Sequence, residues 1–188
     1  MISVPLLIIG AGPAGLCAAY RAAELGVDVL IMERAQKTGG QLVKQTHKFF
    51  GSEQQFASTR GIEISDILTS RLEGLPGRVE IQTDATVLGF YEDGVITAEV
   101  QGKFMKYRPE ACIVATGASE KTLPFMGNDL PGVYGAGAVQ TLMNEYGVRP
   151  GKRVLMIGAG NIGLIVSYQL LQAGVEVAAV LDAAEHIG

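Results

Sequence analysis

The chain is poor in the residues that carry metal and disulfide chemistry. It contains two cysteines and two histidines among its 188 residues. These four residues lie far apart in the sequence, in none of the spacings that close a metal coordination sphere, so we predict no metal site. Cys17 and Cys112 form no C-x-x-C pair, which excludes dithiol chemistry through such a motif. Each is expected to be a small core residue.

Charge and hydropathy exclude further classes of partner. The formal net charge is −4 and no cluster of lysines and arginines occurs, which argues against nucleic acid or an acidic membrane and favours a small-molecule substrate. The apolar start, residues 4–9, has no basic stretch before it and leads straight into a glycine and proline turn. We therefore expect neither a signal peptide nor a membrane span, and the cytoplasm is the default compartment.

A phosphate-binding signature, G-x-G-x-x-G, occurs twice. The copies are GAGPAG at 10–15 and GAGNIG at 158–163. Each follows an apolar run typical of a buried strand and precedes a helix-like stretch, which is the context that the motif requires. Residues 6–33 and 154–181 align at a constant offset of 148 with 11 identities in 28 positions. The chain therefore repeats one supersecondary unit, and two such units predict two dinucleotide sites.

The glycines of the signature have separate tasks. The first permits the tight turn from strand to helix, the second lets pyrophosphate approach the backbone, and the third lets helix and strand pack closely. N–H groups at the start of the helix are then available to phosphates. The glycines are Gly10, Gly12 and Gly15 in the first copy and Gly158, Gly160 and Gly163 in the second.

The two copies differ at the acid expected to bind a ribose. Glu33 lies 23 positions beyond Gly10 at the end of an apolar run, placed to accept hydrogen bonds from an adenosine ribose. The equivalent position in the second copy is Leu181, and the carboxylate of Asp182 comes one residue later. A shift of one residue turns a side chain to the opposite face of a strand. Asp182 is therefore either a ligand rescued by a loop adjustment or a solvated acid at a strand end.

The segments between the copies predict a loop, a helix and a meander. Residues 35–61 are rich in Gly, Gln, Thr, Ser and Lys, which is typical of a long functional loop. Apolar residues then recur with helical spacing over 62–72. Three strand-like runs joined by short turns indicate an antiparallel meander at 85–91, 95–100 and 104–108. Strands of the main parallel sheet are expected at 79–82 and 111–115. A turn-rich junction at 118–153 contains a helix-like stretch at 140–146.

These motifs together resemble flavoproteins with two dinucleotide-binding domains, the pyridine nucleotide-disulfide or thioredoxin-reductase-like group. The resemblance covers essentially the whole chain and rests on both signatures, GGQL at 39–42, the meander and ATG at 115–117. It implies an α/β fold with a Rossmann-like FAD-binding domain, built from a parallel sheet and an antiparallel β-meander, and an incomplete second Rossmann-like βαβ unit. The expected domains are 1–118, the N-terminal part of an FAD-binding domain, and 119–188, a junction with the truncated start of a second, NAD(P)-type domain.

The resemblance also implies which residues hold the cofactors. FAD is expected in the first unit, and NAD(P) or another adenine nucleotide at the second site. The predicted FAD residues are Gly10, Gly12, Pro13, Ala14, Gly15, Glu33, Arg34, Gly40, Gln41, Leu42, Val87, Ala115, Thr116 and Gly117. The predicted residues of the second site are Gly158, Gly160, Asn161, Gly163 and Asp182. Gln41, Lys44 and His47 either face the flavin ring or are ordinary loop residues, and no catalytic residue is assigned.

Two departures from the family pattern shape the functional hypothesis. The junction reads YGAGA at 134–138 where thioredoxin reductases carry a redox C-x-x-C, and the stretch 130–163 looks more like sarcosine oxidase alpha and the opine, proline and cyanide-forming glycine dehydrogenases. The sequence also ends before the family's return segment, so we expect a fragment, or a subunit completed by a partner. The leading hypothesis is an FAD-dependent oxidoreductase that transfers hydride from a small organic donor, an amine or amino acid, or from NAD(P)H. The alternatives are an inactive fragment and a non-catalytic nucleotide-binding or assembly subunit.

Overall fold

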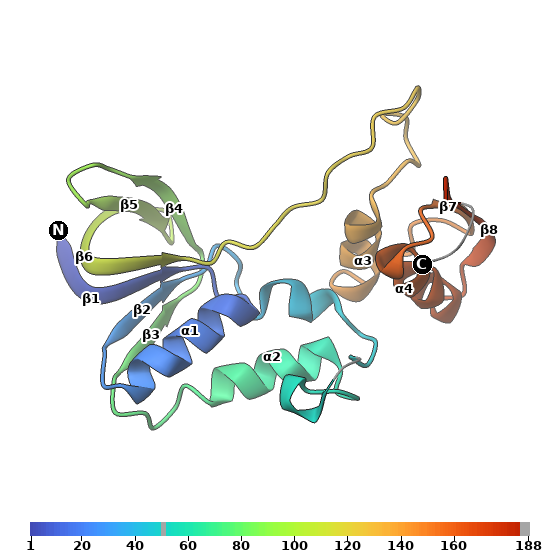
Figure 1. Cartoon of the computed structure of the whole chain (residues 1–188). Helices are drawn as coiled ribbons and strands as arrows, with labels where there is room; N and C mark the ends of the chain where they lie inside the picture. Colours follow the sequence, from blue (N-terminus) through green and yellow to red (C-terminus); the bar gives the residue numbers. More distant parts are fainter. Residues whose placement is uncertain (50–51, 185–188) are drawn as a thin grey trace. The chain divides into compact units, whose positions relative to one another are not determined.

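The computed structural model describes residues 1–49 and 52–184, and Figure 1 labels their helices and strands. The chain forms two compact units, one made of residues 1–42 and 62–118 and the other of residues 43–61 and 119–188. The described part of the chain contains no helix that is long and apolar enough to cross a membrane.

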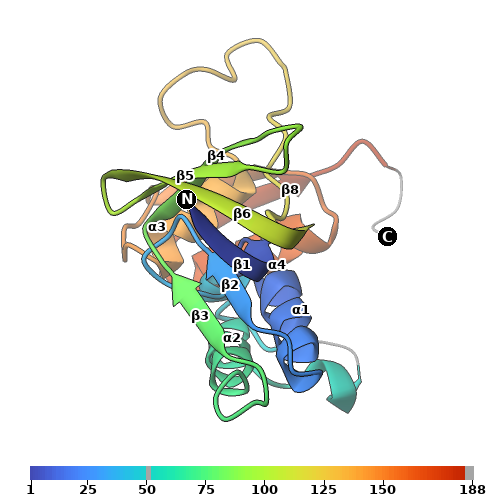
Figure 2. The same cartoon turned by 90° about the vertical axis from the view of Figure 1, so that its left-hand side faces the viewer.

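A six-stranded mixed sheet organises the first unit. Its strands are β1 (Ile2–Ile9), β2 (Val29–Met32), β3 (Val79–Gln82), β4 (Ala85–Phe90), β5 (Ile96–Val100) and β6 (Lys103–Val114), in the order β3-β2-β1-β6-β5-β4. The pairs β3-β2, β2-β1 and β1-β6 are parallel, whereas β6-β5 and β5-β4 are antiparallel. The parallel strands and the meander thus belong to one continuous sheet, as Figure 2 shows from the side of that sheet.

One strand serves both parts of the sheet. The sequence predicts a meander strand at 104–108 and a separate parallel strand at 111–115, but β6 runs without a break through both. Pro109 does not interrupt it. Beyond Tyr107 the strand pairs with β1 alone, and proline is tolerated in a strand with a free edge because no second ladder loses a hydrogen bond.

Two helices accompany the sheet of the first unit. They are α1 (Pro13–Glu24) and α2 (Gly61–Ser70). Leu16, Ala19 and Ala23 repeat at helical spacing and form the buried face of α1. The expectation of a core position for Cys17 is wrong, because this residue lies off that face and is exposed. The main core cluster is made of side chains from five strands of the sheet, β1, β2, β4, β5 and β6. Its buried residues are Leu7, Leu30, Met32, Ala85, Ile96, Ala98 and Tyr107.

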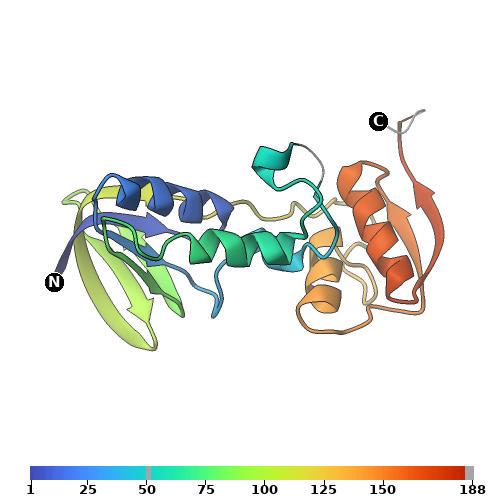
Figure 3. The ribbon, with the colours of Figure 1, turned by 90° about the horizontal axis from the view of Figure 1, so that it is seen from below.

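The second unit repeats the strand-turn-helix-strand pattern on a smaller scale. Its elements are α3 (Ala136–Asn144), β7 (Arg153–Ile157), α4 (Asn161–Gln172) and β8 (Glu176–Leu181), and β7 and β8 form a parallel two-stranded sheet. Figure 3 shows α3 beside α4. Val139 of α3 packs with Val166 and Leu170 of α4 and with Val175. Helix α3 begins four residues earlier than the helical pattern at 140–146 predicts.

Segment 43–61 belongs by its contacts to the second unit, although it lies between two parts of the first unit in the sequence. The predicted loop contains two short 3-10 helices, η1 (Gly40–Lys44) and η2 (Glu53–Gln55), and residues 50 and 51 lie outside the described part. Asn144 donates from Nδ2 to the carbonyl of Lys44 at 2.6 Å, and Gln169 donates from Nε2 to Oγ1 of Thr46 at 3.1 Å. Amide side chains on α3 and α4 therefore hold this segment. The position of the domain boundary stays a prediction.

Candidate nucleotide-binding site

The first glycine turn is closed by the end of β6. Gly10 has φ +105°, and a Cβ built there would lie 2.4 Å from the carbonyl oxygen of Ala115. The Ala115 N–H donates to the carbonyl of Ile9 at 2.8 Å, and the Gly10 N–H donates to the carbonyl of Met32 at 2.8 Å. Only glycine combines this backbone angle with such a close approach. The structure thus brings the predicted residues Gly10 and Ala115 into contact.

The GGQL segment meets the same turn. The Gly39 N–H donates to the carbonyl of Ala11 at 2.7 Å, and a Cβ built on Gly40 would lie 3.0 Å from the Cα of Gly12. A Cβ built on Gly12 would meet no atom nearer than 4.0 Å. The space above Gly12 is therefore open to a ligand, while Gly40 borders it. Gly39 is not among the predicted site residues. The pair Gly39-Gly40 is the sequence signal that could have indicated its close approach to the turn.

The start of α1 is suited to an anion. Gly12 is the N-cap, no side chain caps the helix, and the first turn contains no acidic residue. Pro13 and Ala14 are exposed at this end, whereas Gly15 is buried. A Cβ on Gly15 would lie 1.9 Å from the carbonyl oxygen of Gly10, so the helix packs closely on the turn at this position. The N-terminus of a helix combines uncommitted N–H groups with the positive end of the helix dipole. Phosphate fits this geometry.

Glu33 is held against the turn by two backbone donors. Its Oε2 accepts the Ala11 N–H at 2.8 Å and its Oε1 accepts the Ala35 N–H at 2.8 Å. A carboxylate has about four acceptor positions, so lone pairs remain after these two bonds. The carboxylate is therefore oriented before any ligand arrives and can still accept hydrogen bonds from a ribose.

The other predicted residues of the first site differ in their exposure and in the residues that they pack against. Thr116 and Gly117 lie just beyond the end of β6, after Ala115, and are exposed, as is Gln41. Leu42 is buried, and Val87 packs against the core cluster of the sheet. Arg34 lines a shallow polar hollow with Thr86 and Glu99. Val87 and Leu42 thus contribute to packing in this structure.

Lys44 and His47 each contact a residue of the second unit. The ammonium group of Lys44 lies 3.8 Å from the carboxylate of Glu145. His47 stacks on Phe49 with ring centroids 5.4 Å apart, and burial lowers the pKa of its imidazole.

The second glycine turn has the same backbone. Gly158 also has φ +105°, Gly160 is the N-cap of α4, and Asn161 is its first residue. A Cβ built on Gly163 would lie 2.0 Å from the carbonyl oxygen of Gly158. One feature differs: a Cβ on Gly158 would meet nothing within 4 Å. In the described residues, therefore, no strand end closes this turn as Ala115 closes the first.

Asp182 occupies the place of Glu33, so of the two sequence-based alternatives the structure favours the one in which a local adjustment brings the carboxylate back to the turn. Its Oδ2 accepts the Ala159 N–H at 2.6 Å and its Oδ1 accepts the Ala184 N–H at 2.8 Å. These backbone donors lower the pKa of the carboxyl group. The pattern matches that of Glu33 with Ala11 and Ala35, residue for residue.

A bulge in β8 explains how an acid one position late reaches the same place. Val154 pairs with Val177, but Leu155 pairs with Ala179, so Ala178 is an extra residue. In the first copy Leu6 pairs with Val29 and Leu7 with Leu30, with no such shift. A bulge places two residues opposite one and restores the register beyond it. The offset of the repeat grows from 148 to 149, and Asp182 takes the position of Glu33.

The chain is similar to curated proteins that are named as subunits of oxidases. It is 32% identical over 191 residues to the alpha chain of sarcosine oxidase from Rhizobium meliloti, covering 94% of this chain and 18% of that protein. It is 30% identical over 186 residues to a subunit of opine oxidase from Agrobacterium tumefaciens, covering 96% and 37%. The chain therefore spans well under half the length of these curated relatives.

Solved structures share the fold. L-proline dehydrogenase from P. horikoshii matches with a TM-score of 0.80 at 24% identity, covering 96% of this chain and 35% of that one. Thioredoxin reductase from Lactococcus lactis matches with a TM-score of 0.69 at 21% identity, covering 98% and 57%. These likenesses confirm the Rossmann-like α/β fold that the sequence predicts.

A family model agrees with the two glycine turns and the mixed sheet. The model of the pyridine nucleotide-disulphide oxidoreductases matches residues 4–188, which is nearly the whole chain and includes both turns with their acids. The chain belongs to the pyridine nucleotide-disulphide oxidoreductase family.

Proposed function

We propose that this chain is the dinucleotide-binding part of an FAD-dependent oxidoreductase, with FAD on the first glycine turn. Family membership implies FAD as the cofactor. The observation that carries the proposal is the convergence of three separate segments on the turn at Ala11 and Gly12: the uncapped start of α1, the carboxylate of Glu33, and Gly40 from the GGQL segment. These three segments form a cradle, which is open above Gly12. A Cβ on Gly12 would occupy part of that open space.

The residues of the cradle would bind and orient the nucleotide half of the cofactor. N–H groups at the start of α1 would bind the pyrophosphate, and Glu33 would accept hydrogen bonds from the adenosine ribose. Ala115, packed on Gly10, would place Thr116 and Gly117 at the same edge of the sheet. When bound, the flavin supplies the hydride chemistry, and the protein supplies position and exclusion of water.

The class of substrate rests on the relatives. Sarcosine oxidase, opine oxidase and L-proline dehydrogenase are named for the oxidation of amines or amino acids. We infer a small amine or amino acid as the donor for the enzyme to which this chain belongs. Two of these relatives are named as subunits, which supports a partner chain for this protein as well.

We infer that the second turn binds a second nucleotide, and that Asp182 makes this nucleotide NAD in preference to NADP. The Asp182 carboxylate lies where Glu33 lies in the first turn, and its lowered pKa keeps it charged at neutral pH. An acid at this position accepts hydrogen bonds from a ribose 2′-hydroxyl, whereas a 2′-phosphate needs a basic partner. ATP or another adenine nucleotide with a free ribose fits the same chemistry.

Removal of the charge on Glu33 tests the FAD assignment. Charge-assisted hydrogen bonds contribute roughly 1.5–3 kcal/mol each, so Glu33→Gln should weaken FAD binding by about 10- to 150-fold. Titration followed by flavin fluorescence measures the affinity, and circular dichroism checks that the variant is folded. Glu110→Gln, which changes an exposed glutamate on β6, is the matched control. Equal affinity of Glu33→Gln and the control would remove Glu33 from the site.

A further inference from the structure

Helix α2 carries two hydroxyl side chains on or beside the face that it buries. Ser65 and Thr69 are four residues apart, so they lie one above the other on the helix. Ser65 is 4% exposed, and the residues next to these two along the chain, Ile64 and Leu68, are buried apolar residues. A hydroxyl group at such a position is costly unless it has a hydrogen-bond partner. For both hydroxyl groups a partner lies outside the helix, in Thr38.

Thr38 is held by α2 at two points. Ser65 donates from Oγ to the carbonyl of Thr38 at 3.3 Å, and the hydroxyl oxygens of Thr38 and Thr69 lie 2.9 Å apart. Thr69 already donates from Oγ1 to the carbonyl of Ser65 at 3.0 Å. A hydroxyl group has one hydrogen to donate, so Thr38 is the donor in its pair with Thr69. These three residues form a hydroxyl clamp that fixes both the side chain and the backbone carbonyl of Thr38.

The hydroxyl clamp adjoins the two glycines that border the nucleotide cradle. Gly39 and Gly40, the glycine pair, follow Thr38 directly, and their φ angles are +106° and +52°. Glycine adopts positive and negative φ about equally readily, so the pair does not fix its own conformation. The Gly39 N–H donates to the carbonyl of Ala11 at 2.7 Å. The glycine pair is therefore tied on one side to the first glycine turn and on the other side, through Thr38, to α2.

We propose that Ser65 and Thr69 are positioning residues of the cofactor site, which act through Thr38 to hold the glycine pair against the first glycine turn. This inference rests on the proposed function, the binding of FAD at that turn. A Cβ on Gly40 would lie 3.0 Å from the Cα of Gly12, so Gly40 directly borders the open space above Gly12. Without the clamp the glycine pair samples more conformations in the free chain, and the cofactor must order it on binding. That cost lowers the affinity.

The affinity for FAD measures the effect of the clamp. Ser65→Ala and Thr69→Val each remove one hydrogen bond to Thr38. Each should weaken FAD binding by roughly 5- to 30-fold, the equivalent of ordering one further residue on binding. Thr69→Ser keeps the hydroxyl group and should restore the wild-type affinity. Thr38→Val removes the other half of the Thr38–Thr69 pair, so the double variant with Thr69→Val should bind FAD no more weakly than either single variant.

Amide hydrogen exchange in the chain without FAD separates positioning from a general loss of structure. In Ser65→Ala and Thr69→Val, the Gly39 amide, which donates to Ala11, should exchange at least about fivefold faster than in the wild type. The amides of β1, in the same unit, should keep their wild-type protection. A purely structural role of the two hydroxyl groups would instead raise the exchange of the Gly39 amide and of β1 together.

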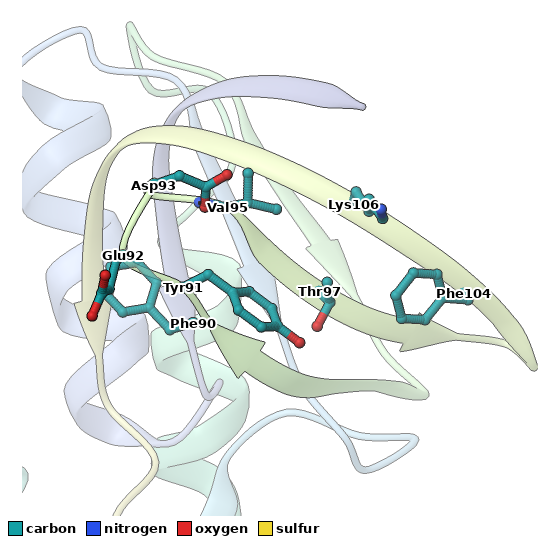
Figure 4. A pocket seen from close by; sticks show the side chains of 8 residues that line it. All are labelled: Phe90, Tyr91, Glu92, Asp93, Val95, Thr97, Phe104 and Lys106. Atoms are coloured by element: carbon teal, nitrogen blue, oxygen red, sulfur yellow. The ribbon is translucent and has the colours of Figure 1, made fainter.

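Two substitutions of the same kind serve as matched controls. Ser70 donates from Oγ to the carbonyl of Asp66 at 2.9 Å on the exposed side of α2, so Ser70→Ala removes a comparable bond outside the clamp. Thr97 is a buried threonine whose Oγ1 has no hydrogen-bond partner among the described residues. It lines a hollow of the meander strands that Figure 4 shows, which includes no residue of the cradle. Ser70→Ala and Thr97→Val should leave both the FAD affinity and the exchange of the glycine pair unchanged.

Failure of the clamp and failure of the proposed function give different results. Absence of FAD binding by the folded wild-type chain overturns the proposed function, and the cofactor role of the clamp with it. If the wild type binds FAD and Ser65→Ala and Thr69→Val bind it equally well, the proposed function stands and the clamp is overturned. Unchanged exchange of the Gly39 amide in these variants overturns the clamp whether or not FAD binds. A further loss of affinity in the double variant also overturns it.

Discussion

The two glycine turns offer a matched pair for one measurement, because they share a backbone and differ in one neighbour. Gly10 and Gly158 both have φ +105°, but only Gly10 faces a carbonyl oxygen, that of Ala115, at 2.4 Å from the position of an added Cβ. Substitution of each glycine by alanine in separate variants therefore imposes the same backbone strain. The variants differ only in the steric overlap.

The expected magnitudes follow from these two contributions. A non-glycine residue held in an unfavourable backbone region costs of order 1–3 kcal/mol. Overlap with a fixed backbone atom adds roughly another 1–3 kcal/mol, since the end of β6 must shift away from β1. Gly10→Ala should thus destabilise the first unit by about 2–6 kcal/mol, and Gly158→Ala the second unit by about 1–3 kcal/mol.

Native-state hydrogen exchange is the appropriate assay because it reads each unit separately, and one overall unfolding curve does not suffice for a chain of two units. Protection in β1 reports on Gly10→Ala, and protection in β7 reports on Gly158→Ala. Gly15→Ala and Gly163→Ala are internal controls that should cost about the same, because their added Cβ atoms would lie 1.9 Å from the carbonyl oxygen of Gly10 and 2.0 Å from that of Gly158. Equal costs for Gly10→Ala and Gly158→Ala would refute the reasoning that β6 closes only the first turn.

Two further predictions concern titratable groups. Backbone donors lower the pKa of Asp182, so its charged form stabilises the fold above the unfolded pKa, and this contribution is lost as pH falls through the folded value. The difference in stability between wild type and Asp182→Asn, measured by exchange in β7, should shrink below about pH 4; a constant difference would contradict the carboxylate contacts. Burial raises the pKa of the Cys112 thiol, whereas Cys17 is exposed. Iodoacetamide at mildly alkaline pH should therefore modify Cys17 first, as mass spectrometry would show, and comparable rates would contradict this.

The repeat makes much of the fold predictable. Both glycine turns, the crossover helices and the strands flanking them follow from local patterns that depend on neighbours in the sequence. The merger of two predicted strands into β6 does not, because Pro109 signals a break and its tolerance depends on which edge of the strand is free. Edge pairing is a tertiary property.

In the candidate site, too, some features follow from local sequence patterns and others depend on tertiary packing. Gly10, Gly12, Gly15, Gly40 and Glu33 are predicted from the sequence and lie together around one turn. The sequence leaves the orientation of Asp182 open, since the bulge at Ala178 has no signature in the residues themselves. The contacts of segment 43–61 with α3 and α4 depend on side-chain amides that lie 100 and 123 positions from their partners in the sequence. Such pairings arise from packing and are absent from any local pattern.

The central claim is that the first glycine turn holds FAD, and titration of the purified chain with FAD tests it most directly. The account predicts saturable binding of FAD at this turn, with a shift of the flavin spectrum. It also predicts competition by ADP, which carries the same pyrophosphate and ribose. Absence of FAD binding by a folded chain, or binding that ADP does not displace and that Glu33→Gln leaves unchanged, would contradict it.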